Sequence, residues 1–309
     1  MIITELKTAR KVNTSPPLAV ALGNFDGVHM GHRRVIEAAV STAKESGGKI
    51  KSAVWCFAEN PKNSTENLTT SEEKTEIFES LGADYVIFED FSSVCDLTPA
   101  EFVLDYLKDL SAVSVFCGFN FRFGKNAKGN KETLMSLSEE SGISVCALPA
   151  VTNDALPVSS TLIRALIKEG DMEKAEKLLC RPFSVTGEVT HGRHLGNTLG
   201  FPTINQNFER GKAIPRHGVY FTETEIDGDI FPSVSNVGDR PTVNGKHVRL
   251  ETHVIDFEGD LYGKCVTVSF KKFCRPEKKF ASEEELRYAV LSDVTNAKAY
   301  FSKEVPSNE

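Results

Sequence analysis

The feature that most constrains the fold is a five-residue apolar run, residues 18–22, which passes directly into a segment rich in glycine and histidine, residues 23–33. An apolar run of this length that ends at a glycine is typical of a buried strand. The spacing of apolar residues over positions 35–40 then predicts an amphipathic helix. His29 and His32 therefore lie where a strand passes into a helix.

A helix N-terminus binds phosphate readily, because its first N–H groups have no partner within the helix and the helix dipole is positive there. Two imidazoles three residues apart add hydrogen-bond donors, and the glycine between them leaves room for a ligand. The alternative is two exposed histidines at a helix start, which the order Gly, Asp, Gly, His, Gly, His disfavours. We predict a phosphate-binding site that also includes Gly23, Phe25, Asp26 and Gly31. The segment resembles the His-x-Gly-His signature of nucleotidyltransferases, which implies that the ligand is a nucleoside triphosphate.

The composition is that of a globular protein, since 40% of the 309 residues are hydrophobic and 26% are charged. The length allows two domains of ordinary size. A net charge of −7 argues against a nucleic-acid partner, because binding to a phosphate backbone requires a basic face. No apolar run has the length of a membrane span and the N-terminus does not read as a signal peptide, so we expect a cytoplasmic protein without a membrane partner. The seven cysteines have no metal-binding spacing and are expected to be reduced.

Apolar runs alternate with helical patterns through the first half of the chain. Further strands are expected at residues 53–57, 85–88, 113–117 and 143–148, and helices at 72–81, 99–110, 132–140, 161–168 and 172–179. Such alternation predicts a parallel sheet with helices on both faces. Ligands bind beyond the carboxyl ends of such strands. Polar clusters follow the strands at residues 23–32, 57–62 and 118–130, which indicates one shared site.

The pattern changes after residues 181–182, where we place the boundary between a domain of residues 1–182 and one of residues 183–309. Short alternating runs follow, at residues 183–189, 218–226, 230–237, 248–257 and 265–270. The turn pairs Asp227-Gly228 and Asn244-Gly245 are typical of hairpins in an antiparallel barrel or sandwich. A last helix is expected from residue 282 to about residue 300, with Ser282 and Glu285 as a capping box.

Two further clusters in the first half suit a nucleotide. Residues 118–125 combine glycines that permit a tight loop, flat phenylalanine faces and basic side chains, which suits an aromatic ring system beside a phosphate; the alternative is a basic loop whose phenylalanines fill the core. Residues 158–164 open a helix that Ser159 or Ser160 can cap. With Thr161 and Arg164 they form a cradle for the β- and γ-phosphates of ATP, whereas plain capping explains only one serine.

In the second half, a glycine-rich loop leads into a polar turn over residues 187–205. Thr203 and Asn205, two apart in an extended segment, point to the same side. A hydroxyl and an amide oxygen placed in this way suit Mg²⁺, while backbone N–H groups nearby hold phosphates. The alternative is the Gly and Pro turns of a β domain. The nucleotide-binding residues expected here are Gly187, Gly192, Gly200, Pro202 and Thr203.

Together the three motifs of the first half, followed by Leu-Leu-x-Arg-Pro at 178–182, resemble the adenylyltransferase module of bacterial riboflavin kinase/FAD synthetases. The first motif is similar to the His-x-Gly-His signature of nucleotidyltransferases. The resemblance implies a Rossmann-like domain that transfers AMP from ATP to FMN, giving FAD and pyrophosphate. His29 and His32 would stabilise the α- and β-phosphates, and magnesium would bridge the phosphates. Ser160, Thr161 and Arg164 would hold the departing pyrophosphate. The flavin contacts implied are Asn60, Phe119, Asn120, Phe121 and Phe123.

The second half resembles riboflavin kinase from residue 181 to about residue 293, with Gly-Phe-Pro-Thr-x-Asn at 200–205. The resemblance implies a small β-barrel with a C-terminal helix that phosphorylates riboflavin to FMN with ATP. Glu251 would be the base for the ribityl hydroxyl, Thr203 and Asn205 would hold Mg-ATP, and Arg275 would lie near the flavin. The chain departs from the family at Asn197, Ile204 and Gln206, where arginine, alanine and an apolar residue are usual, and at Asn60, where histidine is usual.

The leading interpretation is therefore a bifunctional enzyme that makes FMN and then FAD. One alternative is an FAD synthetase whose second domain binds flavin but phosphorylates it poorly, since loss of the guanidinium at position 197 weakens a nucleotide contact about tenfold to a hundredfold. Another is a flavin-sensing regulator, against which the intact histidine and serine motifs argue. A cytidylyltransferase shares the His-x-Gly-His element but needs neither the second domain nor the loop at 119–124.

Overall fold

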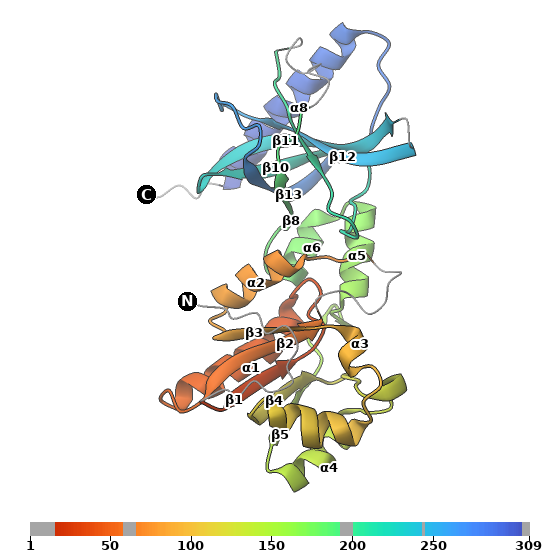
Figure 1. The fold of residues 1–309 in the computed structure, drawn as a ribbon. Helices are drawn as coiled ribbons and strands as arrows, with labels where there is room; N and C mark the ends of the chain where they lie inside the picture. The colour runs from red at the N-terminus through yellow and green to blue at the C-terminus, as the bar shows by residue number, and fades with distance from the viewer. Residues whose placement is uncertain (1–15, 58–65, 192–199, 243–244, 305–309) are drawn as a thin grey trace. The chain divides into compact units, whose positions relative to one another are not determined.

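The computed structural model describes residues 16–57, 66–191, 200–242 and 245–304. The chain divides into two compact units, residues 1–160 and 161–309, each described by itself below (Figure 1). In the described part of the chain, no helix is long and apolar enough to cross a membrane.

The first unit is built on a five-stranded parallel sheet with strand order β3-β2-β1-β4-β5, which confirms the predicted class of fold. Its strands are β1 (Leu18–Leu22), β2 (Lys51–Phe57), β3 (Tyr85–Glu89), β4 (Ala112–Gly118) and β5 (Ser144–Leu148). Its helices are α1 (Met30–Glu45), α2 (Ser71–Ser80), α3 (Phe91–Val94), the π-helix η1 (Glu101–Leu107), the 3₁₀ turn η2 (Lys125–Ala127) and α4 (Lys131–Ser141). A two-stranded hairpin, β6 (Thr152–Asn153) and β7 (Leu156–Pro157), follows β5.

All five residues of β1 are buried, and they alternate between two apolar cores. Leu18, Val20 and Leu22 face a core that includes η1 and α4. Ala19 and Ala21 face the core that α1 and α2 complete. An apolar strand with no polar position is what burial on both faces of a parallel sheet requires.

The order of the strands fixes where a ligand site can form. The connections run outward in opposite directions from the neighbouring strands β1 and β4, so the sheet has its topological switch point there. Ligands of open α/β sheets bind at this point, beyond the carboxyl ends of the strands. The segments that follow β1 and β4, residues 23–29 and 119–130, thus begin at adjacent strands.

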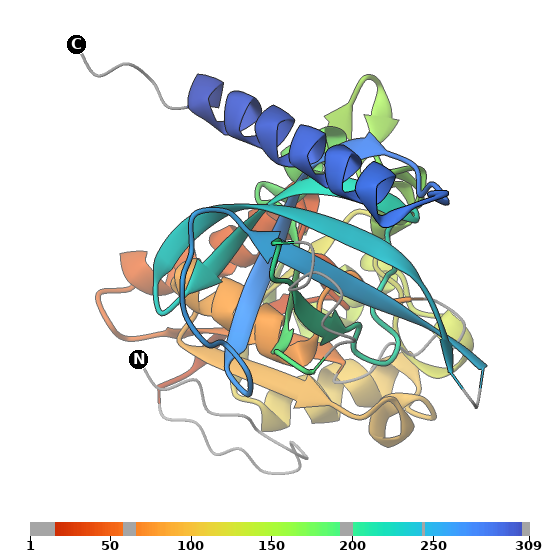
Figure 2. The same ribbon diagram turned by 90° about the horizontal axis from the view of Figure 1, so that it is seen from above.

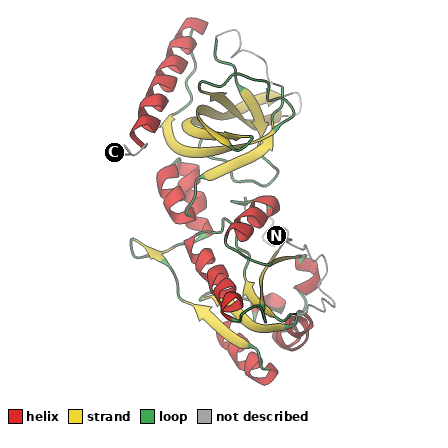
Figure 3. Ribbon diagram, turned by 90° about the vertical axis from the view of Figure 1, so that its left-hand side faces the viewer, coloured by secondary structure: helices red, strands yellow, loops and turns green. Residues whose placement is uncertain are grey.

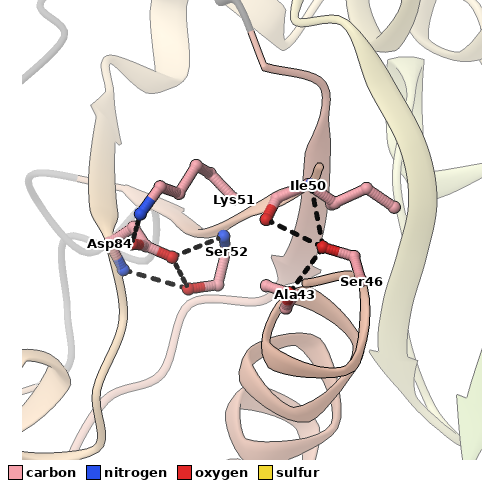
Figure 4. A network of polar contacts seen from close by, with 6 residues as sticks. All are labelled: Ala43, Ser46, Ile50, Lys51, Ser52 and Asp84. Carbon is pink, nitrogen blue, oxygen red and sulfur yellow. Dashed lines mark hydrogen bonds and ion pairs between the residues drawn. The ribbon is translucent and has the colours of Figure 1, made fainter. Parts of the chain in front are cut away.

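A polar network fastens the opposite end of the sheet, where β2 begins (Figure 4). The Asp84 carboxylate accepts hydrogen bonds from the Ser52 backbone N–H (2.9 Å) and hydroxyl (2.8 Å), and from Lys51 Nζ (2.7 Å). Burial alone would raise the pKa of Asp84, but these hydrogen bonds and the Lys51 charge lower it overall. Beside it, Ser46 Oγ accepts the Ile50 N–H (2.9 Å) and closes the turn from α1 to β2.

The second unit is a six-stranded antiparallel sheet in the order β8-β13-β10-β11-β12-β9. Its strands are β8 (Phe183–Glu188), β9 (Ile204–Asn207), β10 (Gly218–Ile226), β11 (Asp229–Thr242), β12 (Gly245–Val254) and β13 (Cys265–Arg275). The edge strands almost close a barrel, because Thr190 N donates to Asn205 O (2.8 Å). Figure 3 shows the strong curvature of these strands. The barrel implied by the family resemblance is thus confirmed.

Three helices belong to this unit's part of the chain, α5 (Ser160–Glu169), α6 (Met172–Leu179) and α8 (Glu283–Glu304). In Figure 2, α8 lies along the outside of the barrel, where Ala297 and Phe301 pack against Val219 and Phe221. The predicted helix start is confirmed, since Glu285 N donates to Ser282 Oγ (3.2 Å).

The predicted turn at Asp227-Gly228 joins β10 to β11, with both residues at positive φ, 52° and 93°. Asn244, of the other predicted turn, lies outside the described residues. Residues 161–182, which the sequence analysis assigns to the first domain, fall in the second compact unit. The boundary at 182 between the two catalytic modules stays a prediction.

Candidate active sites

The segment after β1 holds an uncommon backbone conformation. Phe25 and Val28 have φ of 50° and 40°, in the left-handed region that side chains with a Cβ, and β-branched ones above all, rarely adopt. The Phe25 ring packs over Gly23, where a Cβ would lie only 2.9 Å from two of its atoms. Phe25 is 1% exposed and meets His32 edge to face, with ring centroids 5.4 Å apart. The backbone strain is therefore stored directly beside the predicted phosphate site.

Hydrogen bonds from distant parts of the first unit hold this segment in place. The buried Asp26 carboxylate accepts the Leu68 N–H (2.7 Å), and the Asp26 carbonyl accepts the Ser160 hydroxyl (2.8 Å). Gly27 N donates to Thr69 Oγ1 (3.0 Å). Asp26 and Ser160, both predicted to bind nucleotide, thus contribute to the shape of the loop. Its rigidity preorganises the groups that follow it.

His29 is the N-cap of α1, and its Nδ1 accepts the His32 backbone N–H (3.3 Å). A neutral imidazole whose Nδ1 accepts carries its proton on Nε2, so His29 has one donor to offer a phosphate oxygen. The His29 and His32 rings stack with centroids 3.6 Å apart and planes 19° from parallel. A Cβ on Gly31 would lie 3.2 Å from His29 Cε1, so the room that this glycine leaves accommodates the imidazole.

Both imidazoles are held neutral. Burial lowers the pKa of His29 to about 4. The pKa of His32 is well below its usual range, first because of burial and then because of the His29 and Lys74 charges. His32 Nδ1 is buried, and no described residue hydrogen-bonds to it. At neutral pH the pair therefore acts through N–H dipoles rather than through full charges.

The loop after β4 divides its three phenylalanines between surface and core. Phe119 is 42% exposed, Phe121 is partly buried, and Phe123 is 6% exposed within the core. Phe121 stacks on Phe123 (centroids 5.7 Å apart), which packs against Phe102 (5.2 Å). Asn120 is exposed. Of the predicted flavin contacts described, Phe119, Asn120 and Phe121 present accessible surface, while Phe123 supports Phe121 from below.

Other predicted phosphate ligands lie around the start of α5. Ser159 is partly buried just before the helix, and Thr161 is exposed on its first turn. Arg164 Nη2 donates to Thr161 Oγ1 (3.4 Å), so these two side chains lie side by side. The hydroxyl and the guanidinium thus present an anion-binding pair on one helical turn.

In the barrel, the strand register places three polar residues side by side on neighbouring strands, and two of them, Asn205 and Glu251, are predicted site residues. Asn205 on β9 pairs with Glu251 on β12, and Glu251 pairs with Asn236 on β11. Asn205 is 4% exposed, and no described residue donates to its Oδ1. Thr203 lies just outside β9, and the predicted common direction of the Thr203 and Asn205 side chains stays a prediction. An amide oxygen without a donor beside a carboxylate is an arrangement that suits a cation.

The segment that leads into β9 is bent and anchored. Gly200 has a φ of 84°, and the Pro202 carbonyl lies 2.9 Å from His253 Nδ1 on β12. Gly187 lies in β8, where its carbonyl accepts the Gln206 side-chain amide (2.9 Å). Asn60, Gly192 and Asn197 lie outside the described residues.

The structure accommodates two of the departures from the family. Ile204 packs against the apolar cluster that includes Val189 and Val254. Gln206 is fully buried and also donates to the Val266 carbonyl (2.9 Å), which links β9 to β13. Both side chains therefore complete the barrel wall.

Arg275, expected beside the flavin, forms a two-point ion pair with Asp293 of α8, at 2.7 Å for Nη2–Oδ2 and 3.0 Å for Nε–Oδ1. Its guanidinium thus holds α8 to the end of β13. A flavin contact of Arg275 stays a prediction.

Sequence reasoning missed Lys74, which is 5% exposed on α2 and donates to the Asn24 carbonyl (3.1 Å). The sequence contained an indication that Lys74 is buried, because it lies four residues before the buried Phe78 and therefore on the apolar face of the predicted helix.

Comparisons with known proteins agree on both halves of the chain. A family model described as FAD synthetase matches residues 11–162, and one described as riboflavin kinase matches residues 179–301. Curated proteins called bifunctional riboflavin kinase/FMN adenylyltransferase are similar over almost the whole length. The one from Bacillus subtilis is 32% identical, with 92% of each chain covered, and that from Haemophilus influenzae is 35% identical, with 92% of this chain and 94% of that protein covered. The one from Pseudomonas fluorescens is 37% identical over 90% and 91%.

Among solved structures, a Streptococcus pneumoniae protein titled a macrolide-efflux protein has the same fold. The TM-score is 0.87 at 29% identity, with 96% of this chain and 99% of that chain covered. This likeness concerns the fold, whereas the two domain models and the curated relatives agree on an activity.

Proposed function

This chain belongs to the family of bifunctional riboflavin kinase/FMN adenylyltransferases and carries both enzyme domains, and we propose which of its residues perform the two reactions. It phosphorylates riboflavin to FMN with ATP and joins AMP from a second ATP to FMN, which gives FAD and pyrophosphate. The observation that carries the proposal for the second reaction is the stacked imidazole pair at the N-terminus of α1.

In the adenylyl transfer, an oxygen of the FMN phosphate attacks the α-phosphorus of ATP in line, and pyrophosphate leaves. The attacking oxygen is already anionic, so no base is required. His29, through its Nε2–H, and His32 stabilise the charge on the α- and β-phosphates together with the N–H groups of the first turn of α1. Ser160, Thr161 and Arg164 hold the departing pyrophosphate, and Ser159 binds the nucleotide beside them. The flavin ring lies against Phe119 and Phe121, with Asn60 and Asn120 as polar contacts.

In the kinase reaction, Glu251 takes the proton from the ribityl 5′-hydroxyl, whose oxygen attacks the γ-phosphorus of ATP. The bond from this phosphorus to the β,γ-bridging oxygen breaks, and ADP leaves. Magnesium fits the donor set beside Glu251, because Asn205 Oδ1 is buried and accepts no hydrogen bond from a described residue. Thr203 and Asn205 would hold the ion, which supplies positive charge to the phosphates. The backbone around Gly187, Gly192, Gly200 and Pro202 holds the nucleotide.

One assay tests both assignments. The purified full chain is incubated with ATP and Mg²⁺, supplied with FMN or riboflavin separately, and the products are resolved by chromatography. We expect FAD and pyrophosphate from FMN, and FMN from riboflavin. FAD from FMN without any FMN from riboflavin, even at high enzyme concentration, would indicate an FAD synthetase with a kinase-deficient barrel. Flavin binding without either product would indicate the flavin-sensing alternative.

Substitutions then test the residues. His29→Ala and His32→Ala are each expected to lower the rate of FAD formation about a hundredfold to a thousandfold, with flavin binding nearly unchanged. Glu251→Gln is expected to stop FMN formation and leave the synthesis of FAD from FMN as it was. Near-normal FAD formation by the double histidine variant would contradict the proposed site.

A separate substitution tests the departure at position 197. We expect Asn197→Arg to raise the kinase rate about tenfold to a hundredfold, because a neutral amide does not replace a guanidinium at a phosphate. An unchanged rate would show that the arginine usual in the family is dispensable here.

A further inference from the structure

Lys74 places a cation in the interior of the first unit. Lys74 lies on α2 and is 5% exposed, and its Nζ donates a hydrogen bond to the carbonyl of Asn24, 3.1 Å away. Lysine is almost never buried to this extent without an ion-pair partner, because an ammonium that leaves water loses a large hydration energy.

No described residue places a carboxylate within ion-pair distance of Lys74. The acids close to it along the fold have other partners. Glu73 accepts the Thr70 N–H in the capping box of α2 (3.0 Å), and Asp26 accepts the Leu68 N–H. Lys51, in contrast, has Asp84 at 2.7 Å. One carbonyl satisfies only one of the three donors of the Lys74 ammonium.

The position of this cation relates it to the phosphate site. Asn24 belongs to the segment that joins β1 to α1, between Gly23 and the strained Phe25. The Lys74 charge also contributes to the lowered pKa of His32, so its field reaches the imidazole pair. A polyanion bound at the start of α1 would balance the Lys74 charge, for which the described residues supply no carboxylate.

We propose that Lys74 is a positioning residue of the adenylyl-transfer site, whose buried ammonium holds the Asn24 carbonyl and raises the affinity of the loop for the ATP triphosphate. The inference rests on the proposed function of this loop. It assigns to α2 a part in the binding of the nucleotide, although α2 lies about fifty residues away in sequence.

The test compares Lys74→Met, Lys74→Arg and Lys51→Met in the full chain. Lys74→Met keeps most of the side-chain volume and removes the charge. Lys51→Met is the matched control, because Lys51 lies in the same unit, at the start of β2, and is paired with the Asp84 carboxylate (Figure 4). Four quantities are measured: KM for ATP and kcat in FAD synthesis from FMN, the urea midpoint without ligand, and the rate of riboflavin phosphorylation. Trp55 is the only tryptophan and lies in β2, so its emission follows unfolding of the first unit alone.

We expect Lys74→Met to raise KM for ATP about tenfold to a hundredfold, as the loss of a charge-assisted interaction does. Its urea midpoint without ligand should equal or exceed that of the wild type, because the variant removes a buried charge to which no described carboxylate is paired. Lys74→Arg keeps the positive charge and should have a KM for ATP close to that of the wild type. Lys51→Met should lower the urea midpoint and leave KM for ATP unchanged. Riboflavin phosphorylation should be the same in all variants.

An unchanged KM for ATP in Lys74→Met would overturn the proposal. So would a Lys74→Met chain that no longer folds, or one in which the urea midpoint and kcat fall while KM stays constant, since these results describe a merely structural lysine. Failure of the proposed function is a distinct result, in which the wild type itself forms no FAD.

Discussion

At the scale of single residues, the burial of His29 links the phosphate site to the stability of the fold. The pKa of this imidazole falls from 6.5 to about 4 on folding, because burial disfavours the imidazolium. Between these two values the unfolded chain binds more protons than the folded one, so stability falls as the pH falls through this range. The stabilisation is complete above pH 6.5 and is lost below about pH 4.

The prediction concerns His29→Asn, whose amide oxygen can still cap α1 by accepting the His32 N–H. A pKa difference of this size corresponds to about 3 kcal/mol of unfolding free energy between pH 7 and pH 4. Between pH 7 and pH 4, we therefore expect the free energy of unfolding of the variant to fall by about 3 kcal/mol less than that of the wild type. Urea unfolding followed by Trp55 emission at pH 7, 5.5 and 4 measures the difference. Parallel curves for the two proteins would show that His29 does not titrate as the structure requires.

The sequence was enough to predict that His29 and His32 lie together at the start of a helix, but not the contact of Lys74. His29, His32 and Gly31 lie within four residues, so their spacing at the end of a strand is enough to predict an anion site. Lys74 meets Asn24 from a position fifty residues away, and this contact exists only because α2 folds back beneath the loop. A sequence shows a lysine on an apolar helix face but not the carbonyl that it holds.

At the scale of elements, apolar runs predicted the five strands of the parallel sheet, because buried strands of such a sheet are mostly apolar. The short hairpin of β6 and β7 was not predicted. Apolar periodicity also did not predict that the middle of the helix expected at residues 99–110 is the π-helix η1. Within η1, Tyr106 accepts the Trp55 Nε1–H (2.8 Å) and donates to the buried Glu89 carboxylate. These partners come from two different strands, β2 and β3, so the sheet fixes the position of η1. Long-range hydrogen bonding of this kind leaves no local pattern.

The ion pair between Arg275 on β13 and Asp293 on α8 holds this helix to the barrel. The Asp293 side chain is 7% exposed, so its ion pair with Arg275 is largely shielded from water. Asp293→Ala leaves a partly buried guanidinium unpaired and is expected to lower the stability of the second unit by about 3 kcal/mol. Hydrogen exchange should show faster opening of the α8 amides. The double variant Arg275→Met, Asp293→Leu should recover most of the loss, because neither charge remains, and a double variant as unstable as Asp293→Ala would contradict this account.

At the scale of the whole molecule, the predicted catalytic boundary and the boundary of the compact units differ by about twenty residues. The sequence analysis places the boundary after residue 182, while the compact units divide at residue 160. The segment between them is α5 and α6, and α6 contacts the barrel through ion pairs from Glu176 to Lys271 (2.8 Å) and from Glu173 to Lys272 (3.3 Å). Arg164 on α5 is nonetheless one of the residues that we propose for the adenylyl transfer. The structural and the catalytic limits of the first module are therefore expected to differ.

Two fragments test this difference. Residues 1–182 should fold, give the far-UV spectrum of an α/β sheet and form FAD from FMN, because they contain every residue proposed for that reaction. The apolar face of α6 loses its barrel partner, so this fragment should bind a hydrophobic dye that the full chain does not bind. Residues 1–160 should keep the sheet and the Trp55 emission of the folded unit but lose FAD synthesis, since Thr161 and Arg164 are absent. A fragment 1–182 that is unfolded would place the boundary elsewhere, and a fragment 1–160 as active as the full chain would remove Thr161 and Arg164 from the site.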